Sequence, residues 1–549
     1  MKRWKIIIAT AGLFVLLAAF LPNNDRLFSI AKNLEIFAEL FKIINEQYVE
    51  ELNPNELIKK GMDPMLDGLD PYTNYFSEDM VEDIRTSRTG QYAGIGASTK
   101  RFQNRTKVTE IVEGSPAARS GLKAGDEILR IDGIELIKIT QEEAEKLVRG
   151  QAGNSVRLQV LKAGSITPIE IDIKREKIQL KTVSHFGMAD PETGYIALDE
   201  FGAESSNEVK AALLQLKEKG ARFLILDLRG NPGGLLDQAV SICGLFIPKG
   251  SLVVVNKGKT PESNIQYHTR SNPMEPEMPI AVLIDRGSAS ASEIVSGTLQ
   301  DYDRAVVLGE RSYGKGLVQT RRPLSFNSFS MITTAKYYTP SGRCIQALDY
   351  SNRRKDGSVG SIPDSLKKTF FTKNGRKVYD GGGVDPDIVI NRSIYPELIS
   401  VLEEEGHILD YGTEYQLKHN TIAEPPSFEL SESVMDDFYS WIGKRTIKIE
   451  ADLEKSVETF QAVAVAEGAP AILESVKDIE TGLKRFRRKQ LLEQKHELKK
   501  LLTKEIVSRY YFKKGAREAS FKYDPELKTA LDMVKNEAGM SQILAKKPK

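Results

Sequence analysis

Cysteine is nearly absent from the sequence, with two residues in a chain of 549. Two cysteines cannot form a disulfide framework, and neither Cys243 nor Cys344 stands in a CxxC pair or at metal-ligand spacing from a histidine. The sequence therefore predicts no metal site. Cys243 lies in an apolar segment, where a small buried hydrophobic residue is expected, and Cys344 lies in a turn. Whether the two cysteines form one disulfide is left open.

Histidine and net charge are also scarce. The five histidines share no motif, so a catalytic histidine is not indicated. Basic and acidic residues number 77 and 76, which leaves no overall field that would select nucleic acid. Apolar residues make up 40% of the chain and charged residues 28%, as in a folded globular protein. A chain of this length exceeds the size of one hydrophobic core, so three or four domains are expected.

A long hydrophobic run is found at the N-terminus. Lys2, Arg3 and Lys5 precede the apolar segment 6–21, and Pro22 ends it. This order is typical of a signal peptide. No Ala-x-Ala cleavage site precedes Pro22, and the run falls short of the ~20 residues that a membrane-spanning helix needs. We expect export, with the protein either free in the periplasm or anchored in the membrane and facing the periplasm.

The middle of the chain contains a pattern of strand, tight turn and helix start. The apolar run 278–284 predicts a buried strand, and Glu293 opens a segment whose apolar residues fall on one helical face. Ser290 and Glu293 have the spacing of a capping box, in which the serine only satisfies backbone amides. A serine at this place can instead attack a carbonyl, with the N–H of Ala291 stabilising the oxyanion. The pattern alone leaves both interpretations open.

A nucleophilic serine requires a base, and lysine is the alternative to histidine. Lys315 stands between two glycines after the strand-like segment 304–309. A lysine near its reference pKa of about 10.4 cannot accept a proton, so its amine must be desolvated. Gln319 could orient the amine through its side-chain oxygen. A surface turn of the form Gly-Lys-Gly would look the same in sequence.

The combination of these segments resembles a known family. The string SASASE at 288–293, the 25-residue spacing from Ser290 to Lys315 and the following Gln319 resemble the C-terminal processing, or tail-specific, proteases. These are serine peptidases with a Ser/Lys dyad, and the resemblance extends over roughly residues 40–395. It implies that Ser290 is the nucleophile, Lys315 the base and Gln319 the residue that positions the lysine. It also implies a ClpP/crotonase-like α/β catalytic body with an inserted PDZ domain.

Short strands and turns dominate from residue 90 to about residue 162. The segment 92–97 resembles the carboxylate-binding loop of PDZ domains, and the segments 121–133 and 140–148 complete the resemblance. In such domains backbone N–H groups bind the terminal carboxylate of a peptide that adds as a strand. An internal packing domain without peptide affinity is the alternative. The resemblance implies that the peptide-binding residues are Tyr92, Ala93, Gly94, Ile95, Gly96, Leu147 and Val148.

Strand-like and helix-like segments alternate between residues 194 and 228, which predicts α/β layers. The string RGNPGG at 229–234 then lies where a strand ends and a helix begins, a place that offers unblocked backbone amides. A phosphate-binding loop is disfavoured because the string lacks the Walker spacing and its Lys-Ser/Thr pair. The family pattern DLRxNxGG implies that Gly233 or Gly234 supplies the second oxyanion-hole N–H, opposite Ala291.

Three further regions carry weaker signals. The N-terminal helices could hold dimer contacts, as in some family members, or form a packing scaffold. An insertion at 349–380 departs from the family pattern and could be a substrate-facing lid or only a loop. The basic run 484–489 has acidic neighbours, which favours a solvated helix face over nucleic-acid or membrane binding.

The predicted segments are a signal peptide or membrane anchor at 1–22, an N-terminal helical region at 27–88, a PDZ domain at 89–165, a Ser/Lys peptidase body at 166–395 and a helical C-terminal domain at 396–549.

These features predict an exported serine endopeptidase that recognises protein C-terminal tails through its PDZ domain and cleaves them through an acyl-enzyme on Ser290. No cofactor is required. The expected partners are protein or peptide substrates with accessible C-termini, a second copy in a homo-oligomer, and the membrane through the N-terminal segment. Two alternatives are a PDZ adaptor that binds C-termini without proteolysis and a hydrolase of small esters. The complete dyad disfavours the adaptor, and the ester hydrolase leaves the carboxylate loop without a role.

Overall fold

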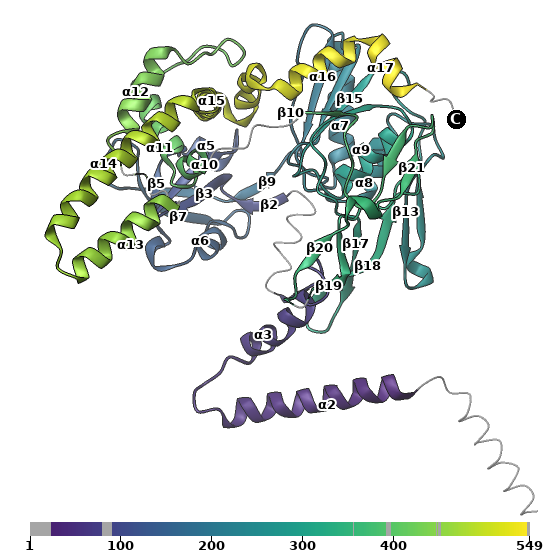
Figure 1. Cartoon of the computed structure of the whole chain (residues 1–549), viewed down its shortest axis with the longest axis horizontal. Coiled ribbons are helices and arrows are strands. Elements are labelled where there is room, and N and C mark those ends of the chain that lie inside the picture. The colour runs from purple at the N-terminus through teal and green to yellow at the C-terminus, as the bar shows by residue number, and fades with distance from the viewer. Residues whose placement is uncertain are drawn as a thin grey trace, which may run out of the picture. The chain divides into compact units, whose positions relative to one another are not determined.

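The computed structural model describes residues 24–78, 91–354, 356–390, 397–445, 447 and 452–545 (Figure 1). The signal peptide or anchor predicted at 1–22 lies outside these ranges. The chain divides into two compact units, of which one comprises Met1–Phe76 with Arg321–Ile332 and the other comprises Ser77–Thr320 with Thr333–Lys549. Within the described ranges, no helix combines the length and the apolar character that crossing a membrane requires.

The first unit contains two of the predicted N-terminal helices, α2 (Asn24–Gln47) and α3 (Pro54–Asp67). Asn53 caps α3, because its side chain accepts amide hydrogens from the first turn. Strand β1 (Asn74–Phe76) follows, within the region 27–88 that the sequence predicts to be helical. It is a strand because it pairs antiparallel with β18 (Phe329–Tyr338), a contact that local sequence cannot reveal.

The PDZ region forms an antiparallel sheet in the order β3-β4-β5-β7-β8, with β6 beside β5. Helix α6 (Gln141–Val148) begins with a capping box between Thr140 and Glu143. The sheet continues past residue 165, the expected end of this domain, because β8 pairs with β7 along its whole length. The strands are β2 (Gln91–Gly94), β3 (Ala97–Phe102), β4 (Arg105–Ile111), β5 (Glu127–Ile131), β6 (Ile134–Glu135), β7 (Ser155–Leu161), β8 (Ile169–Lys174) and β9 (Glu176–Gln179), which pairs with β2.

A six-stranded sheet in the order β10-β11-β12-β15-β16-β23 forms the centre of the α/β body, and all strands but β10 run parallel. Alternate residues of β11 and β12 belong to two different core clusters, so both faces of the sheet are covered, as in other parallel sheets. Helices α7, α8 and α9 supply the helical residues of one cluster, and α16 (Pro525–Lys535) and α17 (Glu537–Leu544) supply those of the other (Figure 1). The elements are β10 (Val183–Met188), β11 (Thr193–Leu198), α7 (Ser205–Glu218), β12 (Phe223–Asp227), α8 (Leu236–Cys243), β15 (Ile280–Ile284), α9 (Ala291–Asp301), β16 (Val306–Gly309) and β23 (Ile388–Val389).

A second sheet has the order β1-β18-β13-β14, with β17 (Leu317–Pro323) also paired to β18. Its other strands are β13 (Leu252–Gly258) and β14 (Ile265–His268). The insertion predicted at 349–380 is mostly ordered into two hairpins. They consist of β19 (Leu348–Arg353) with β20 (Val359–Ser361) and of β21 (Thr369–Phe371) with β22 (Lys377–Tyr379).

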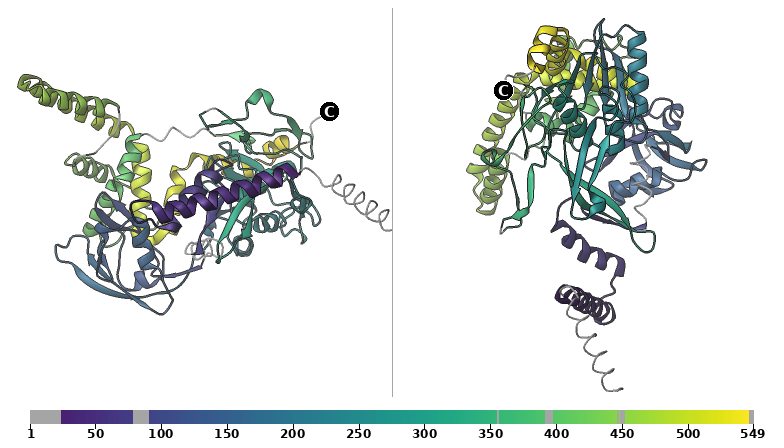
Figure 2. Two further views of the ribbon diagram at one scale, coloured as in Figure 1. Left: turned by 90° about the horizontal axis from the view of Figure 1, so that it is seen from below. Right: turned by 90° about the vertical axis from the view of Figure 1, so that its right-hand side faces the viewer.

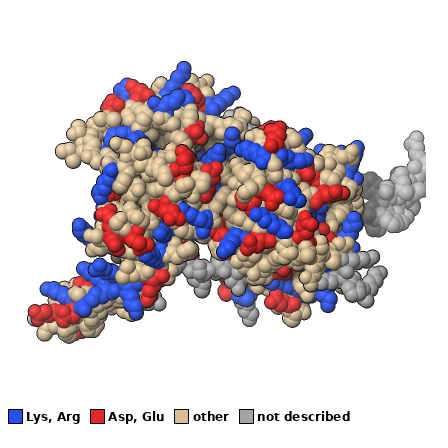
Figure 3. Space-filling view, turned by 90° about the horizontal axis from the view of Figure 1, so that it is seen from above, with Lys and Arg blue, Asp and Glu red and all other residues tan. Residues whose placement is uncertain are grey.

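The C-terminal region is helical, as predicted. Helices α13 and α14 lie side by side as a hairpin (Figure 2). Arg487, in the basic run of α14, bonds Glu454 of α13. Figure 3 shows basic and acidic side chains mixed over most of one face of the molecule. The helices are α10 (Glu397–Glu404), α11 (His407–Lys418), α12 (Glu432–Ile442), α13 (Asp452–Ala466), α14 (Pro470–Glu493), α15 (Lys495–Ser520), α16 (Pro525–Lys535) and α17 (Glu537–Leu544).

Both cysteines are free thiols in this structure, which answers the question that the sequence left open. Cys243 is buried on α8, as its apolar segment predicts, and burial raises the pKa of its thiol to about 12. It therefore behaves as a small hydrophobic core residue.

Candidate active site

Ser290 lies at the junction of β15 and α9, where the sequence predicts a tight turn. Its backbone has φ 55° and ψ −112°, a conformation that residues other than glycine rarely adopt. Neighbouring groups hold it there: its amide donates to Glu293 Oε2 at 2.8 Å, and its carbonyl accepts the Tyr337 hydroxyl at 3.1 Å. Strained residues of this kind cluster at active sites.

The three serines of the SASASE string have different surroundings. Ser288 and Ser292 are fully buried, and their hydroxyls donate to the backbone carbonyls of Leu228 at 2.8 Å and Asn231 at 2.9 Å. Ser290 is only partly buried. Among the three, Ser290 is therefore the serine that a substrate can reach.

The buried carboxylate of Glu293 joins the serine turn to the loop that carries Lys315. Oε2 accepts the backbone amides of Ser290 at 2.8 Å and Lys315 at 2.9 Å. Oε1 accepts the Gly314 amide at 2.7 Å and the Ser312 hydroxyl at 2.6 Å. The sequence predicts only a capping-box role for this glutamate, because no spacing rule links it to a loop about twenty residues away.

Burial raises the pKa of Glu293 to about 7, although its hydrogen-bond donors oppose the shift. Three of these donors are backbone amides, which cannot accept a hydrogen bond in return. Protonation of the carboxyl group would place its hydrogen close to these amide hydrogens and break a hydrogen bond. The ionised carboxylate is consequently the form that holds the two loops together.

The glycine-rich loop lies directly beside the serine turn. Gly233 has φ 101°, and a Cβ there would lie 2.7 Å from Ser290 Cβ and 2.9 Å from the Ala291 nitrogen, so this approach requires glycine. Its amide donates to Asn231 Oδ1 at 2.8 Å. The backbone amides of Ala291 and Gly234, in contrast, donate to no acceptor among the residues that the structure describes.

Asn231 is a positioning residue that the sequence analysis did not single out. Its Nδ2 donates to the Leu198 carbonyl at 2.8 Å, which fixes the loop to β11. Its own carbonyl accepts the Ala289 amide at 3.0 Å, which fixes the serine turn. The signal for Asn231 in the sequence is the asparagine of the DLRxNxGG string, a string from which only the glycines are predicted to act in the site.

Lys315 is partly buried in the loop between β16 and β17. The Gly316 amide beside it donates to Gln346 Oε1 at 2.8 Å, and a Cβ on this glycine would lie 2.7 Å from the Gln346 nitrogen. Gln319 lies on β17, where its Nε2 donates to the Thr333 hydroxyl at 3.2 Å. This orientation leaves the side-chain oxygen of Gln319 as the atom that can accept a hydrogen bond from an amine.

The two segments predicted to bind peptide lie next to each other. The Gly150 amide donates to the Ala93 carbonyl at 3.2 Å, which joins β2 to the end of α6. Arg175 secures the helix end, because it donates to the carbonyls of Leu147 at 2.7 Å and Val148 at 3.2 Å. Leu147 is half-buried and Val148 is buried.

The segment 92–97, which resembles a carboxylate-binding loop, packs closely around the side chain of Tyr92. The Tyr92 ring covers Gly94, since a Cβ there would lie 2.7 Å from Tyr92 Cε2. Burial raises the pKa of the Tyr92 phenol, and the positive charge of Arg149 acts in the opposite direction. Ile95 between the two glycines is buried in the PDZ core. The loop is therefore rigid on its inner side.

Comparison with known proteins supports this description. The model of peptidase family S41 matches residues 192–351, a PDZ domain model matches 83–161, and the C-terminal helical domain model of probable PDZ-proteases matches 398–534. A carboxy-terminal-processing protease of Bartonella bacilliformis is 36% identical over 346 residues, or 62% of this chain and 79% of that protein. A probable CtpA-like serine protease of Staphylococcus aureus is 34% identical over 356 residues, or 63% and 71%. Among solved structures, a photosystem II D1 C-terminal processing protease covers 68% of this chain and 97% of its own at 23% identity, with a TM-score of 0.35.

The α/β body with its strained serine, the PDZ domain and the helical C-terminal domain define a serine peptidase with a peptide-binding module. The chain belongs to the carboxy-terminal-processing proteases of peptidase family S41, hydrolases that act on peptide bonds. The predicted family, fold class and enzyme class are confirmed.

We expect Glu293→Gln to lower kcat by roughly 10- to 100-fold, because hydrogen bonds to a charged group contribute about 1.5–3 kcal/mol each. The amide NH2 would face backbone donors and loosen both loops. In the parent enzyme, activity should rise as the pH passes about 7, where the carboxylate ionises. The variant should lack this rise. Initial rates on a peptide substrate across neutral pH provide the measurement.

Ser312→Ala is the matched control, because it removes one donor to the same carboxylate and leaves the three amide donors in place. This variant should retain the rise near neutral pH with a smaller loss of kcat. Thermal unfolding of each protein separates a catalytic defect from a folding defect. A rise near neutral pH that persists in Glu293→Gln would contradict the role given to this carboxylate.

Proposed function

We propose that this peptidase cleaves proteins near their C-terminal tails, with Ser290 as nucleophile and Lys315 as base in an acyl-enzyme mechanism. The observation that carries the proposal is the Glu293 carboxylate, which accepts the backbone amides of both residues. One side chain therefore restrains both halves of the dyad. The partial burial of Lys315 supports the removal of water that a neutral amine requires.

The proposed chemistry begins when the Lys315 amine accepts the Ser290 hydroxyl proton and Oγ bonds to the scissile carbonyl carbon. The amides of Ala291 and Gly234 stabilise the oxyanion, while Gly233, whose amide already has an acceptor, provides the close approach. The ammonium then gives the proton to the leaving amine as the peptide bond breaks. Water, deprotonated by the same lysine, attacks the ester and releases the serine.

Substrate selection in this proposal lies with the PDZ domain. The loop amides at 94–96 receive the terminal carboxylate of a protein or peptide tail. The end of α6 with Leu147 and Val148 contacts the last apolar side chain of the tail. A PDZ adaptor without proteolysis is less well supported, because the serine turn, the lysine loop and the glycine-rich loop are all assembled.

We further propose that the chain is exported and acts in the periplasm, free or anchored by its N-terminal segment. The basic residues followed by the apolar run at 6–21 support this location. Helix α2 supports a homo-oligomer, because Leu34, Phe37 and Leu40 expose roughly half or more of their surface and would be covered by a second copy.

Ser290→Ala should reduce peptide cleavage by at least about 10³-fold, while folding and tail binding remain intact. Ser288→Ala and Ser292→Ala should retain activity, and each should lose about 1 kcal/mol of unfolding free energy through a lost buried hydrogen bond. Cleavage of a fluorogenic peptide with an apolar C-terminal tail, together with thermal unfolding, measures both effects. Equal loss of cleavage in all three variants would show that the nucleophile is assigned to the wrong residue.

Leu147→Glu should raise KM for a tail-bearing protein and leave kcat on a short peptide without a tail unchanged. A carboxylate in the groove opposes both the apolar side chain and the terminal carboxylate of the tail. Glu142→Ala, on the exposed side of the same helix, is the control and should change neither constant. An unaltered KM for the tail-bearing protein in Leu147→Glu would argue against this groove.

A further inference from the structure

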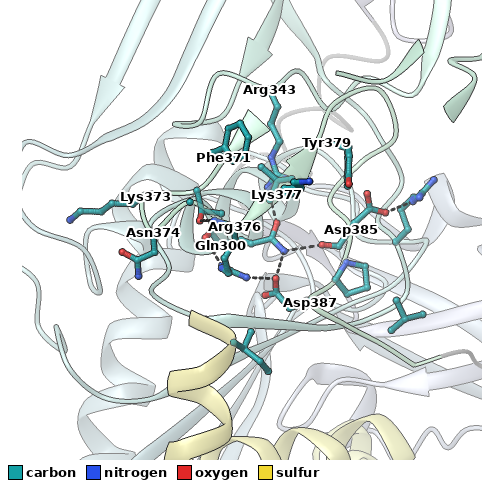
Figure 4. A pocket seen from close by; sticks show the side chains of 17 residues that line it. Gln300, Arg343, Phe371, Lys373, Asn374, Arg376, Lys377, Tyr379, Asp385 and Asp387 are labelled. Atoms are coloured by element: carbon teal, nitrogen blue, oxygen red, sulfur yellow. Dashed lines mark hydrogen bonds and ion pairs between the residues drawn. The ribbon is translucent and has the colours of Figure 1, made fainter. Parts of the chain in front are cut away.

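A pocket of about 1380 Å³ lies on the α/β body, apart from the serine turn, and is shown from close by in Figure 4. Nine of its 17 lining residues come from the continuous segment 371–379. This segment belongs to the insertion that departs from the family pattern. The insertion therefore forms part of a pocket, a feature that the sequence, which suggested a lid or a loop, did not indicate.

The lining of the pocket carries more positive than negative charge. Five basic side chains line it, against two carboxylates. Each of the three arginines has a carboxylate partner, since Arg376 pairs with Asp387, Arg311 with Asp385 and Arg343 with Asp301. The lysines of the lining form no ion pair with any residue in the described part of the chain. The basic residues are Arg311, Arg343, Lys373, Arg376 and Lys377.

Arg343 is the least satisfied of these groups. Its side chain is fully buried, and its Nη2 bonds Gln300 Oε1 at 2.8 Å and pairs with Asp301 at 3.0 Å. Its Nε and Nη1 have no hydrogen-bond acceptor among the described residues. A buried charged donor without an acceptor is destabilising, so an external acceptor would be strongly favoured. Figure 4 shows Arg343 above the group formed by Gln300, Arg376 and Asp387.

The remaining lining is largely apolar, with Phe371, Val378, Val389 and Ile543 among its residues. The volume also far exceeds that of a single inorganic ion. We propose that this pocket binds an amphipathic oxyanion, whose carboxylate or phosphate group is held by Arg343 and Lys377 and whose apolar body lies against Phe371 and Ile543.

An occupant of this pocket would also restrain the loop of Lys315. The segment that follows Arg343 holds that loop, because the Ala347 amide donates to the Gly314 carbonyl at 2.9 Å and Gln346 accepts the Gly316 amide. Arg343 itself contacts α9 through Gln300 and Asp301. We therefore expect amide hydrogen exchange in the segment 312–316 to slow when the pocket is filled.

Isothermal titration calorimetry on the full chain tests the binding. The chain carries Ser290→Ala, so that catalysis plays no part, and Leu147→Glu, so that the PDZ groove does not compete for a carboxylate. The probes are hexanoate, hexyl phosphate, inorganic phosphate and hexanol. On this background, Arg343→Lys should weaken binding of the hexyl anions about tenfold and Lys377→Ala about threefold. Lys249→Ala, an exposed lysine outside the pocket, is the matched control and should change nothing.

Tighter binding of hexanoate would identify a carboxylate ligand, and tighter binding of hexyl phosphate a phosphate ester; either supports the proposal. If Arg343→Lys fails to fold, Lys377→Ala decides alone. Unchanged affinity in Lys377→Ala, hexanol binding as tightly as hexanoate, inorganic phosphate binding as tightly as hexyl phosphate, or no binding of any probe would each overturn it. Unchanged exchange in 312–316 on saturation would overturn the link to the lysine loop.

Discussion

One buried carboxylate, that of Glu293, connects the serine turn and the lysine loop of the candidate active site, two segments that share neither a helix nor a strand. Glu293 has no exposed surface, and a buried ion is stable only when its lone pairs accept hydrogen bonds. Four donors meet this requirement, and they belong to the serine turn and to the lysine loop. A displacement of either loop would remove hydrogen bonds from the buried carboxylate of Glu293. The positions of Ser290 and Lys315 are therefore coupled through this carboxylate.

A second ionic network holds the glycine-rich loop from the opposite direction. Arg229 precedes this loop and bonds Asp227 on β12 as well as Asp524 and Glu526 at the start of α16. Although burial opposes it, the charge of Arg229 lowers the pKa of Asp227 to about 2. The helical C-terminal domain thus supplies countercharges beside the glycine-rich loop. Loss of both Asp524 and Glu526 would leave Arg229 with one of its three carboxylate partners, a change that buried ion networks tolerate poorly.

Local patterns were sufficient for much of the fold and of the site. The strand, turn and helix around Ser290 were predictable, because apolar runs and small residues record local backbone requirements. The contact of Glu293 with the lysine loop was not predictable from such patterns, and neither was the role of Asn231 in fixing the serine turn. Strand β8 was equally unpredictable from local patterns, because it extends the PDZ sheet only by pairing with β7. Each of these features depends on residues distant in sequence, about which periodicity carries no information.

The strain at Ser290 is sustained by the whole of α9. A positive φ at a serine costs about 1–3 kcal/mol and would relax if the helix could shift. All eleven residues of α9 are buried, so no side of the helix is free to move into solvent. Glu293 anchors its first turn to the lysine loop, and Asp301 anchors its last residue to Arg343. Because Arg343 also lines the basic pocket, α9 begins at the strained serine and ends beside a ligand-sized cavity. The rigidity needed for catalysis and the unsatisfied donors of that cavity therefore belong to the same structural element.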